Sequence, residues 1–250
     1  MGEEQGRESR LSFNRSIRIR GGDERLSSLG GVVLLRELDE RLGVTQRLGS
    51  SLSDPRQSGK VTWSLATQLR ARVYALAAGF GAQRDVTALG QDPMLRLSSS
   101  EHRGVQPLKE GLMSQPTLAR LQRILGLSPN LSALKKSVFA LGLQVIRAAG
   151  ATKGAHTLDV DSMPVMSHGQ QPGSVWNGYY RGRCFHPLMA LHGETGTMLS
   201  AELRPGNVPS AQGARRFLLE QLEAFEPDLG PVGCVRADSS FASRALLNGL

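Results

Sequence analysis

The spacing of the apolar residues changes near residue 150, and this change constrains the fold more than any other feature of the chain. Before it, apolar residues recur every three or four positions, the period of a helix with one buried face. We expect helices over four segments: 33–42, 63–78, 117–125 and 131–149. In the first of these, the apolar set is Val33, Leu34, Leu38 and Leu42. No strand signal of comparable strength occurs there, so the sequence predicts a helical region over residues 23–150. The polar residues 1–22, rich in Gly, Arg and Glu, are expected to form a flexible basic arm.

The residues after 150 follow the two-residue period of strands. In the segment 157–162, Leu158 and Val160 point one way, and Asp159 and Asp161 point the other. Later segments predict a hairpin with its turn at 193–196, an amphipathic helix, a short strand and a further helix: 185–192, 198–203, 210–225, 233–236 and 242–250. Three strands, a helix, a strand and a helix is the order of the ribonuclease-H-like fold. The sequence therefore predicts an α + α/β chain, in which the helical region precedes an incomplete ribonuclease-H-like domain over residues 151–250.

The excess of basic over acidic residues lies entirely in residues 1–150. The chain has a net charge of +8, yet residues 1–150 carry 22 Lys and Arg against 13 Asp and Glu, and residues 151–250 carry 8 against 9. An excess of basic residues favours an anionic partner, and nucleic acid is the first candidate. The helical region is therefore expected to bind DNA.

One segment of this region is typical of a helix that contacts phosphate. In Ser114–Leu121, a polar start and Pro116 favour a helix N-terminus, whose free backbone N–H groups would lie near Arg120 and Arg123. The segment resembles the start of a helix-turn-helix recognition helix. An ordinary capped surface helix is the alternative.

Two aspartates occupy matching strand ends. Asp161 ends the first predicted strand and Asp238 follows the fourth, and in the ribonuclease-H-like order these strands are parallel neighbours about 4.8 Å apart. Two carboxylates this close repel unless a cation bridges them, and oxygen ligands favour a pair of Mg²⁺ ions, for which Mn²⁺ could substitute. Asp159 is the alternative first ligand. Arg236, two residues before Asp238, could orient a phosphate or could be an ordinary surface arginine.

Several motifs occur in the order seen in one family. They are TLDVDSMPV (157–165), HGQQ (168–171), NGYY (177–180), LRPGNV (203–208) and RADSSFAS (236–243), with LLRELDERLG (34–43), DPMLRL (92–97) and SQPTLARL (114–121) before them. Together, over residues 30–250, they resemble the DDE transposases of bacterial insertion sequences, in the branch that carries HGQQ and NGYY. The resemblance implies metal-dependent DNA strand cleavage and strand transfer at terminal inverted repeats. Asp161 and Asp238 would then be the first two acids of the DDE triad.

The resemblance also implies a role for the loop after the first strand. His168, Gln170 and Gln171 would contact the DNA ends, and Tyr179 and Tyr180 would stack on unpaired bases. The alternative is that these aromatic rings only hold the loop to the core.

The third acid of the triad, a glutamate on a later helix, has no equivalent before Leu250. We therefore expect a partial or inactive copy of the enzyme. One alternative is a non-catalytic fragment that occupies the terminal repeats and represses transposition. Another is a free-standing nuclease that uses Glu220 or Glu223 as its third ligand.

The remaining expectations concern partners and location. The family implies terminal-repeat and target DNA as partners, and a homo-oligomer on paired DNA ends. With no signal peptide, no membrane-length apolar run and only two cysteines, Cys184 and Cys234, the sequence predicts a cytoplasmic, nucleoid-associated protein.

Overall fold

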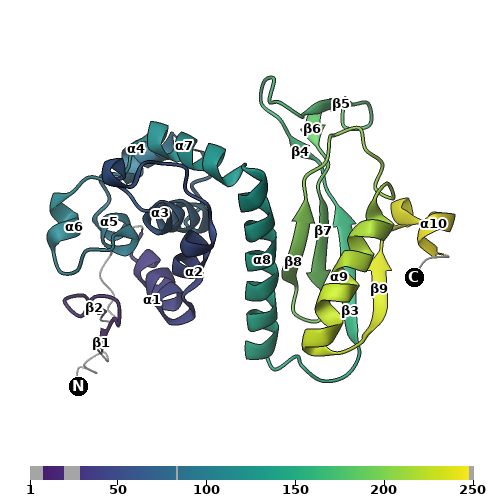
Figure 1. Ribbon diagram of the computed structural model, residues 1–250, viewed down its shortest axis with the longest axis horizontal. Helices are drawn as coiled ribbons and strands as arrows, with labels where there is room; N and C mark the ends of the chain where they lie inside the picture. Colours follow the sequence, from purple (N-terminus) through teal and green to yellow (C-terminus); the bar gives the residue numbers. More distant parts are fainter. Residues whose placement is uncertain (1–7, 20–28, 83, 248–250) are drawn as a thin grey trace, which may run out of the picture. The chain divides into compact units, whose positions relative to one another are not determined.

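The computed structural model describes residues 8–19, 29–82 and 84–247, which divide into two compact units, Met1–Leu134 and Lys135–Leu250 (Figure 1). The boundary lies inside helix α8 (Ser128–Ala148). Asn130 on this helix bonds to Ser53 of the first unit, whereas Leu143 and Ile146 belong to a core of the second. The sequence places the change of region at residue 150, where α8 has just ended.

The first unit is mainly helical. Its elements are β1 (Ser9–Arg10), β2 (Arg18–Ile19), α1 (Val32–Leu42), α2 (Val44–Ser51), the 3-10 turn η1 (Ser58–Lys60), α3 (Leu65–Ala77), α4 (Asp85–Leu89), α5 (Pro93–Ser99), α6 (Gln106–Lys109) and α7 (Gln115–Leu125). The helices predicted over 63–78, 117–125 and 131–149 are found as α3, α7 and α8, with every end within three residues of its predicted position. One buried core joins Leu69 of α3 to Leu118 and Leu121 of α7.

Residues 8–19 differ from the flexible arm that the sequence predicts. They form an antiparallel hairpin of β1 and β2, and Leu11 and Phe13 are buried against Val33 of α1. The backbone N–H of Ser12 donates to Glu37 at 2.8 Å. Because two large apolar side chains leave water here, this segment is held to the helices. The rest of the predicted arm, 1–7 and 20–22, lies outside the described residues.

Helix α1 forms where predicted, but of its predicted apolar face only Val33 is fully buried. Leu34 and Leu38 are 57% and 53% exposed, whereas Arg36 and Asp39 are 4% and 8% exposed. The neighbours of α1 explain this. Its inward face meets the ring of Phe13, 5.0 Å from the Arg36 guanidinium, and the polar side chains Thr45 and Tyr74, which donate to Asp39. Charge pairing and hydrogen bonds offset the cost of burying these ions.

The second unit is built on a mixed sheet with the strand order β8-β7-β3-β9. Its elements are β3 (His156–Ser162), β4 (Val165–Met166), β5 (Val175–Asn177), β6 (Gly182–Phe185), β7 (Leu188–His192), β8 (Thr197–Glu202), α9 (Ala214–Leu229), β9 (Val232–Ala237), the 3-10 turn η2 (Ser239–Phe241) and α10 (Arg244–Leu247). Strands β7 and β8 form the predicted hairpin. Strand β3 is antiparallel to β7 and parallel to β9.

The two faces of β3 have different surroundings, as its alternation predicts. Val160 is buried with Phe217 and Leu218 of α9, which lies along this face of the sheet (Figure 1). Leu158 is buried with Phe225 of the same helix. Asp159 and Asp161 point to the opposite face, where Asp161 is exposed.

A second, three-stranded sheet with the order β4-β6-β5 lies between β3 and β7 in the chain. The apolar run predicted over 185–192 is divided between β6 and β7, because Pro187 lies between these strands and has no N–H to continue a strand ladder. This sheet carries the HGQQ and NGYY segments.

Within the described residues, none of the helices has the length and apolar character needed to cross a membrane.

Candidate active site

The register of β3 and β9 brings Asp161 and Asp238 to facing positions. Asp159 is paired with Arg236 and Val160 with Ala237, so one further step places Asp161 opposite Asp238. In a parallel pair, residues in register point to the same face, and neighbouring strands are about 4.8 Å apart. Both aspartates are exposed on the face of the sheet that α9 does not cover.

The backbone around each aspartate orients its carboxylate. Oδ1 of Asp161 accepts from the N–H of Ser162 at 2.7 Å. Oδ1 of Asp238 accepts from the N–H of Ser240 at 2.9 Å and from its hydroxyl at 2.5 Å, which caps η2. Within the part of the chain that the structure describes, neither carboxylate forms an ion pair. Each carboxylate therefore keeps an oxygen atom that can bind a cation.

Asp159, the alternative first ligand, is already paired. Arg236 donates to both of its carboxylate oxygens. Nε of Arg236 lies 2.6 Å from Oδ1, and Nη2 lies 2.6 Å from Oδ2. These hydrogen bonds and the charge of Asp159 raise the pKa of Arg236 above its ordinary value. Since both groups satisfy each other, this geometry favours Asp161 over Asp159 as the group that faces a cation.

The glutamates considered as a third ligand do not join the pair. Glu220 lies on α9 and forms an ion pair with Arg216 at 2.7 Å, and Glu223 is exposed on the same helix. Among the described residues, no cluster of three His, Cys, Asp or Glu side chains contains Asp161 or Asp238.

The three-stranded sheet β4-β6-β5 and its loops present most of their motif residues to solvent. His168, Gln170 and Gln171 are exposed, as is Tyr179, which is 87% exposed. Tyr180 is half-buried and packs against the ring of His186, 6.1 Å away. Of the two tyrosines, only Tyr180 therefore has the contacts expected of a ring that holds the loop to the core.

Asn177 positions the turn that carries these tyrosines, a role that the sequence did not reveal. Its Oδ1 accepts from the N–H groups of Tyr179 and Tyr180 at 2.9 and 3.2 Å. Its Nδ2 donates to the carbonyl of Gly206 at 2.6 Å, which ties the NGYY turn to the LRPGNV segment. A side-chain amide before a turn is a known signal for this arrangement.

Arg204 of the LRPGNV segment is structural. Its side chain is buried and donates to four carbonyl oxygens, those of His186, Pro209, Ser210 and Gln212. Ser210, at the end of this loop, is 2.8 Å from the hydroxyl of Ser162 on β3. The loop is thus fixed next to the strand that carries Asp161.

In the first unit, Arg120 and Arg123 share the exposed face of α7. The opposite face of this helix is buried through Leu118, Leu121 and Ile124. Neither arginine forms an ion pair within the described residues, and Arg120 bonds only to the hydroxyl of Thr117 at 3.3 Å. Two unpaired cations therefore lie one turn apart, Arg120 in the middle of the helix and Arg123 in its last turn.

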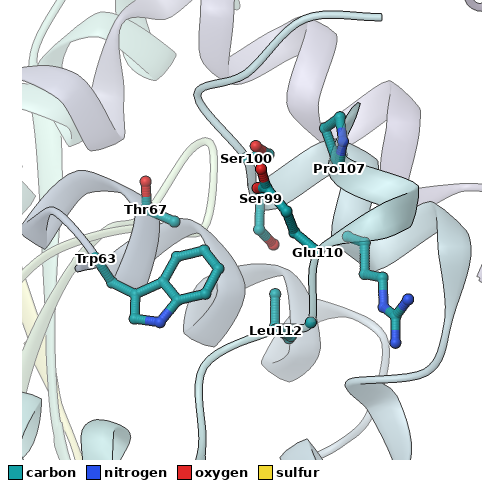
Figure 2. Close-up of a pocket in the computed structure, with 9 residues that line it drawn as sticks. Trp63, Thr67, Ser99, Ser100, Pro107, Glu110 and Leu112 are labelled. Carbon is teal, nitrogen blue, oxygen red and sulfur yellow. The ribbon is translucent and has the colours of Figure 1, made fainter. Parts of the chain in front are cut away.

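The hollow drawn in Figure 2 is too small to be a substrate site. It lies in the first unit, with a volume of about 10 Å³, and Trp63, Ser99 and Leu112 are among its lining residues. That volume suits about one water molecule.

A larger hollow of about 310 Å³ in the same unit is lined by the ionic groups of α1 and α3, Arg36, Asp39 and Arg70 among them. Arg36 and Arg70 each have one buried nitrogen without a hydrogen bond.

Comparison with known proteins supplies the family. Residues 9–250 match the family model described as "Transposase DDE domain group 1". No curated protein and no solved structure matches the chain.

Proposed function

The chain belongs to the DDE transposase family, whose members act on DNA, and on this premise we propose that Asp161 and Asp238 are two of the three catalytic carboxylates. The facing positions of these residues on β3 and β9 carry the proposal. The strand order β8-β7-β3-β9, with only β3 and β9 parallel, supports a ribonuclease-H-like fold for the second unit.

The family typically uses divalent metal ions, and we propose Mg²⁺, with Mn²⁺ as a substitute. The donor set fits, because Asp161 and Asp238 offer only carboxylate oxygens and no cation of the described chain neutralises them. A bound pair of such ions activates a water or a 3′-hydroxyl and stabilises the leaving oxygen of a phosphodiester. The part of the protein is to hold the two carboxylates on a rigid sheet, with the loop at Ser210 fixed next to β3.

The DNA substrate is proposed to be the terminal inverted repeats of an insertion sequence. Arg120 and Arg123 on α7 would contact phosphates, because they are exposed, unpaired and one turn apart on the same face of the helix. His168, Gln170, Gln171, Tyr179 and Tyr180 would contact the DNA ends, and the exposure of Tyr179 supports stacking on an unpaired base. Arg236 is assigned to orient Asp159 and not to contact phosphate.

A repressor function is the second candidate, and the lack of a third acid beside the two aspartates in the described part of the chain favours it. The described residues bring together two carboxylates and no third acid. A chain with this arrangement would bind terminal repeats without cutting them and would repress transposition. For either function, we also propose that the chain forms a homo-oligomer that pairs two DNA ends.

The test uses a plasmid that carries the gene together with its flanking genomic DNA. We expect Mg²⁺-dependent nicking of this plasmid, lost in Asp161→Asn and in Asp238→Asn. Asp228→Asn is the matched control, since Asp228 is an exposed aspartate paired with Arg147. Loss of nicking in Glu220→Gln would favour the free-standing nuclease. Binding of the flanking DNA without nicking in Mg²⁺ or Mn²⁺ would establish the repressor function, and the absence of both binding and nicking would refute both proposals.

A further inference from the structure

Two buried histidines and a glutamate meet at the end of the main sheet opposite to Asp161. His156 begins β3, and His192 ends β7, where it is in register with Leu158. The two histidines are 3% and 0% exposed, on the face that α9 covers, and the ring of Phe225 packs against both. Glu194 lies in the turn between β7 and β8 and is 41% exposed.

The ligand-type atoms of these three side chains converge on one point. Nδ1 of His156 lies 3.0 Å from Nε2 of His192, which in turn lies 3.0 Å from Oε2 of Glu194. All three atoms fall within 4.8 Å of one another. A tetrahedral zinc ion with ligands at about 2.0–2.1 Å separates its ligand atoms by about 3.3 Å. The two separations of 3.0 Å would therefore need to open by only a few tenths of an ångström, and the ligand atoms of His156 and Glu194, which lie within 4.8 Å, would settle at a similar spacing.

The outer contacts of both rings turn their lone pairs toward this point. Nε2 of His156 lies 3.0 Å from the carbonyl oxygen of Leu229, and because a carbonyl can only accept, this nitrogen carries the proton. In the neutral ring, Nδ1 is then a lone pair. Nδ1 of His192 lies 2.8 Å from the hydroxyl of Thr195, which lies 2.8 Å from that of Thr197. A hydroxyl can donate or accept, so metal binding at Nε2 of His192 requires the direction in which Nδ1 of His192 donates to Thr195 and Thr195 donates to Thr197. Such outer partners commonly fix the tautomers of metal-binding histidines.

We propose that His156, His192 and Glu194 bind a transition-metal ion, with Zn²⁺ as the expected metal. Two imidazole nitrogens and one carboxylate suit zinc, whereas magnesium prefers a shell of oxygen atoms.

The proposed zinc site is separate from the carboxylate pair. His156 and Asp161 are five positions apart on β3, which corresponds to about 16 Å along a strand. The two positions also face opposite sides of the sheet. The metal would hold the start of β3 to the β7–β8 turn, and its role would be to stabilise the second unit.

Zinc binding to the full chain tests this proposal. After treatment with a chelator, the protein is titrated with ZnCl₂ in a calorimeter, and with CoCl₂ while the visible absorption of the cobalt ion is recorded. We expect one equivalent of Zn²⁺ with a raised unfolding temperature, and a cobalt spectrum typical of nitrogen ligation in a four-coordinate site. Failure to bind one equivalent of either metal would overturn the proposal.

Variants locate the ion. Glu194→Gln should weaken Zn²⁺ binding by about tenfold or more, since Glu194 is exposed enough for the variant to fold. His192→Gln should abolish binding. Because His192 is buried, this variant can fail to fold, and the Glu194→Gln variant then provides the test. Glu223→Gln, an exposed glutamate of α9 outside the cluster, should bind as the wild type does. Wild-type affinity in Glu194→Gln, or loss of binding in the double variant Asp161→Asn, Asp238→Asn, would place the metal elsewhere.

Discussion

Asp159 and Arg236 face each other on the parallel strands β3 and β9 and join through two contacts of 2.6 Å, two residues before Asp161 and Asp238. The ion pair accounts for one of the two aspartates on the outer face of β3 and leaves the other for a cation. Asp159 and Asp161 lie on the same face of β3, and the ion pair with Arg236 distinguishes Asp159 from Asp161.

The first prediction separates the two aspartates. Asp161→Asn should lower Mg²⁺-dependent nicking by more than the roughly 100-fold that loss of an outer partner costs. Asp159→Asn should lower it by about tenfold, because it releases Arg236 but leaves Asp161 and Asp238 in place. Nicking rates at saturating Mg²⁺ give the comparison. A larger loss in Asp159→Asn than in Asp161→Asn would make Asp159 the ligand.

The second prediction concerns the buried ions of the first unit. Asp39 accepts from the N–H of Thr45 at 2.8 Å and from the hydroxyl of Tyr74 at 2.8 Å, and it lies 3.5 Å from Nε of Arg70. Burial and the charge of Asp39 raise the pKa of Tyr74, so the phenol keeps its proton and donates. Asp39→Asn leaves the buried Arg70 without its closest counter-charge and should destabilise the unit by about 3 kcal/mol.

Trp63, half-buried in this unit, reports its unfolding when Trp176 of the other unit is replaced in a Trp176→Phe background. Urea titrations followed by Trp63 fluorescence give the free energy. Asp54→Asn is the control, because the pair of Asp54 and Arg56 is near the surface and its loss should cost less than about 1 kcal/mol. Equal costs in the two variants would show that the Asp39 cluster does not stabilise the fold.

The third prediction addresses the DNA contacts of α7. Arg120→Ala and Arg123→Ala should each weaken binding to duplexes of any sequence, and each should reduce the slope of log affinity against log salt by about 1. Fluorescence anisotropy over a range of salt concentrations measures this slope. Arg41→Ala removes an arginine that is 72% exposed but paired with Glu37, and it should leave the slope unchanged. Slopes unchanged in both α7 variants would exclude phosphate contacts by this helix.

The sequence predicts those parts of this structure that depend on local pattern. The alternation in β3 assigns Leu158 and Val160 to the core and Asp159 and Asp161 to the other face, since successive side chains of a strand must alternate. The facing positions of Asp161 and Asp238 follow once the strand order is inferred.

What the sequence does not predict depends on contacts between distant residues. In helix α1, Arg36 points inward because it packs on Phe13, and Asp39 points inward because Tyr74 donates to it. The periodicity of the helix sequence does not predict these contacts with distant residues. Likewise His156 and His192 are 36 residues apart, and only the pairing of β3 with β7 brings their rings together.

The last prediction concerns Gly206, whose carbonyl receives the hydrogen bond from Asn177. A methyl group at this position would meet the carbonyl oxygen of Cys184 and would lie 2.6 Å from its Sγ and 2.8 Å from the carbonyl oxygen of Val175. Two of these three atoms are backbone and cannot move aside. Gly206→Ala should therefore push the LRPGNV segment away from β5 and β6, loosen the turn that carries Tyr179 and uncover Cys184.

Thiol titration with DTNB under native conditions measures this opening. In the wild type, the exposed Cys234 should react and the buried Cys184 should not. In Gly206→Ala, both thiols should react, and binding to DNA with unpaired ends should weaken because the tyrosine turn is displaced. Gly178→Ala is the matched control in the neighbouring turn, since a methyl group there meets nothing within 4 Å. A single reactive thiol in Gly206→Ala would mean that the segment yields without opening, and the tie between the LRPGNV and NGYY segments would then not depend on close packing at Gly206.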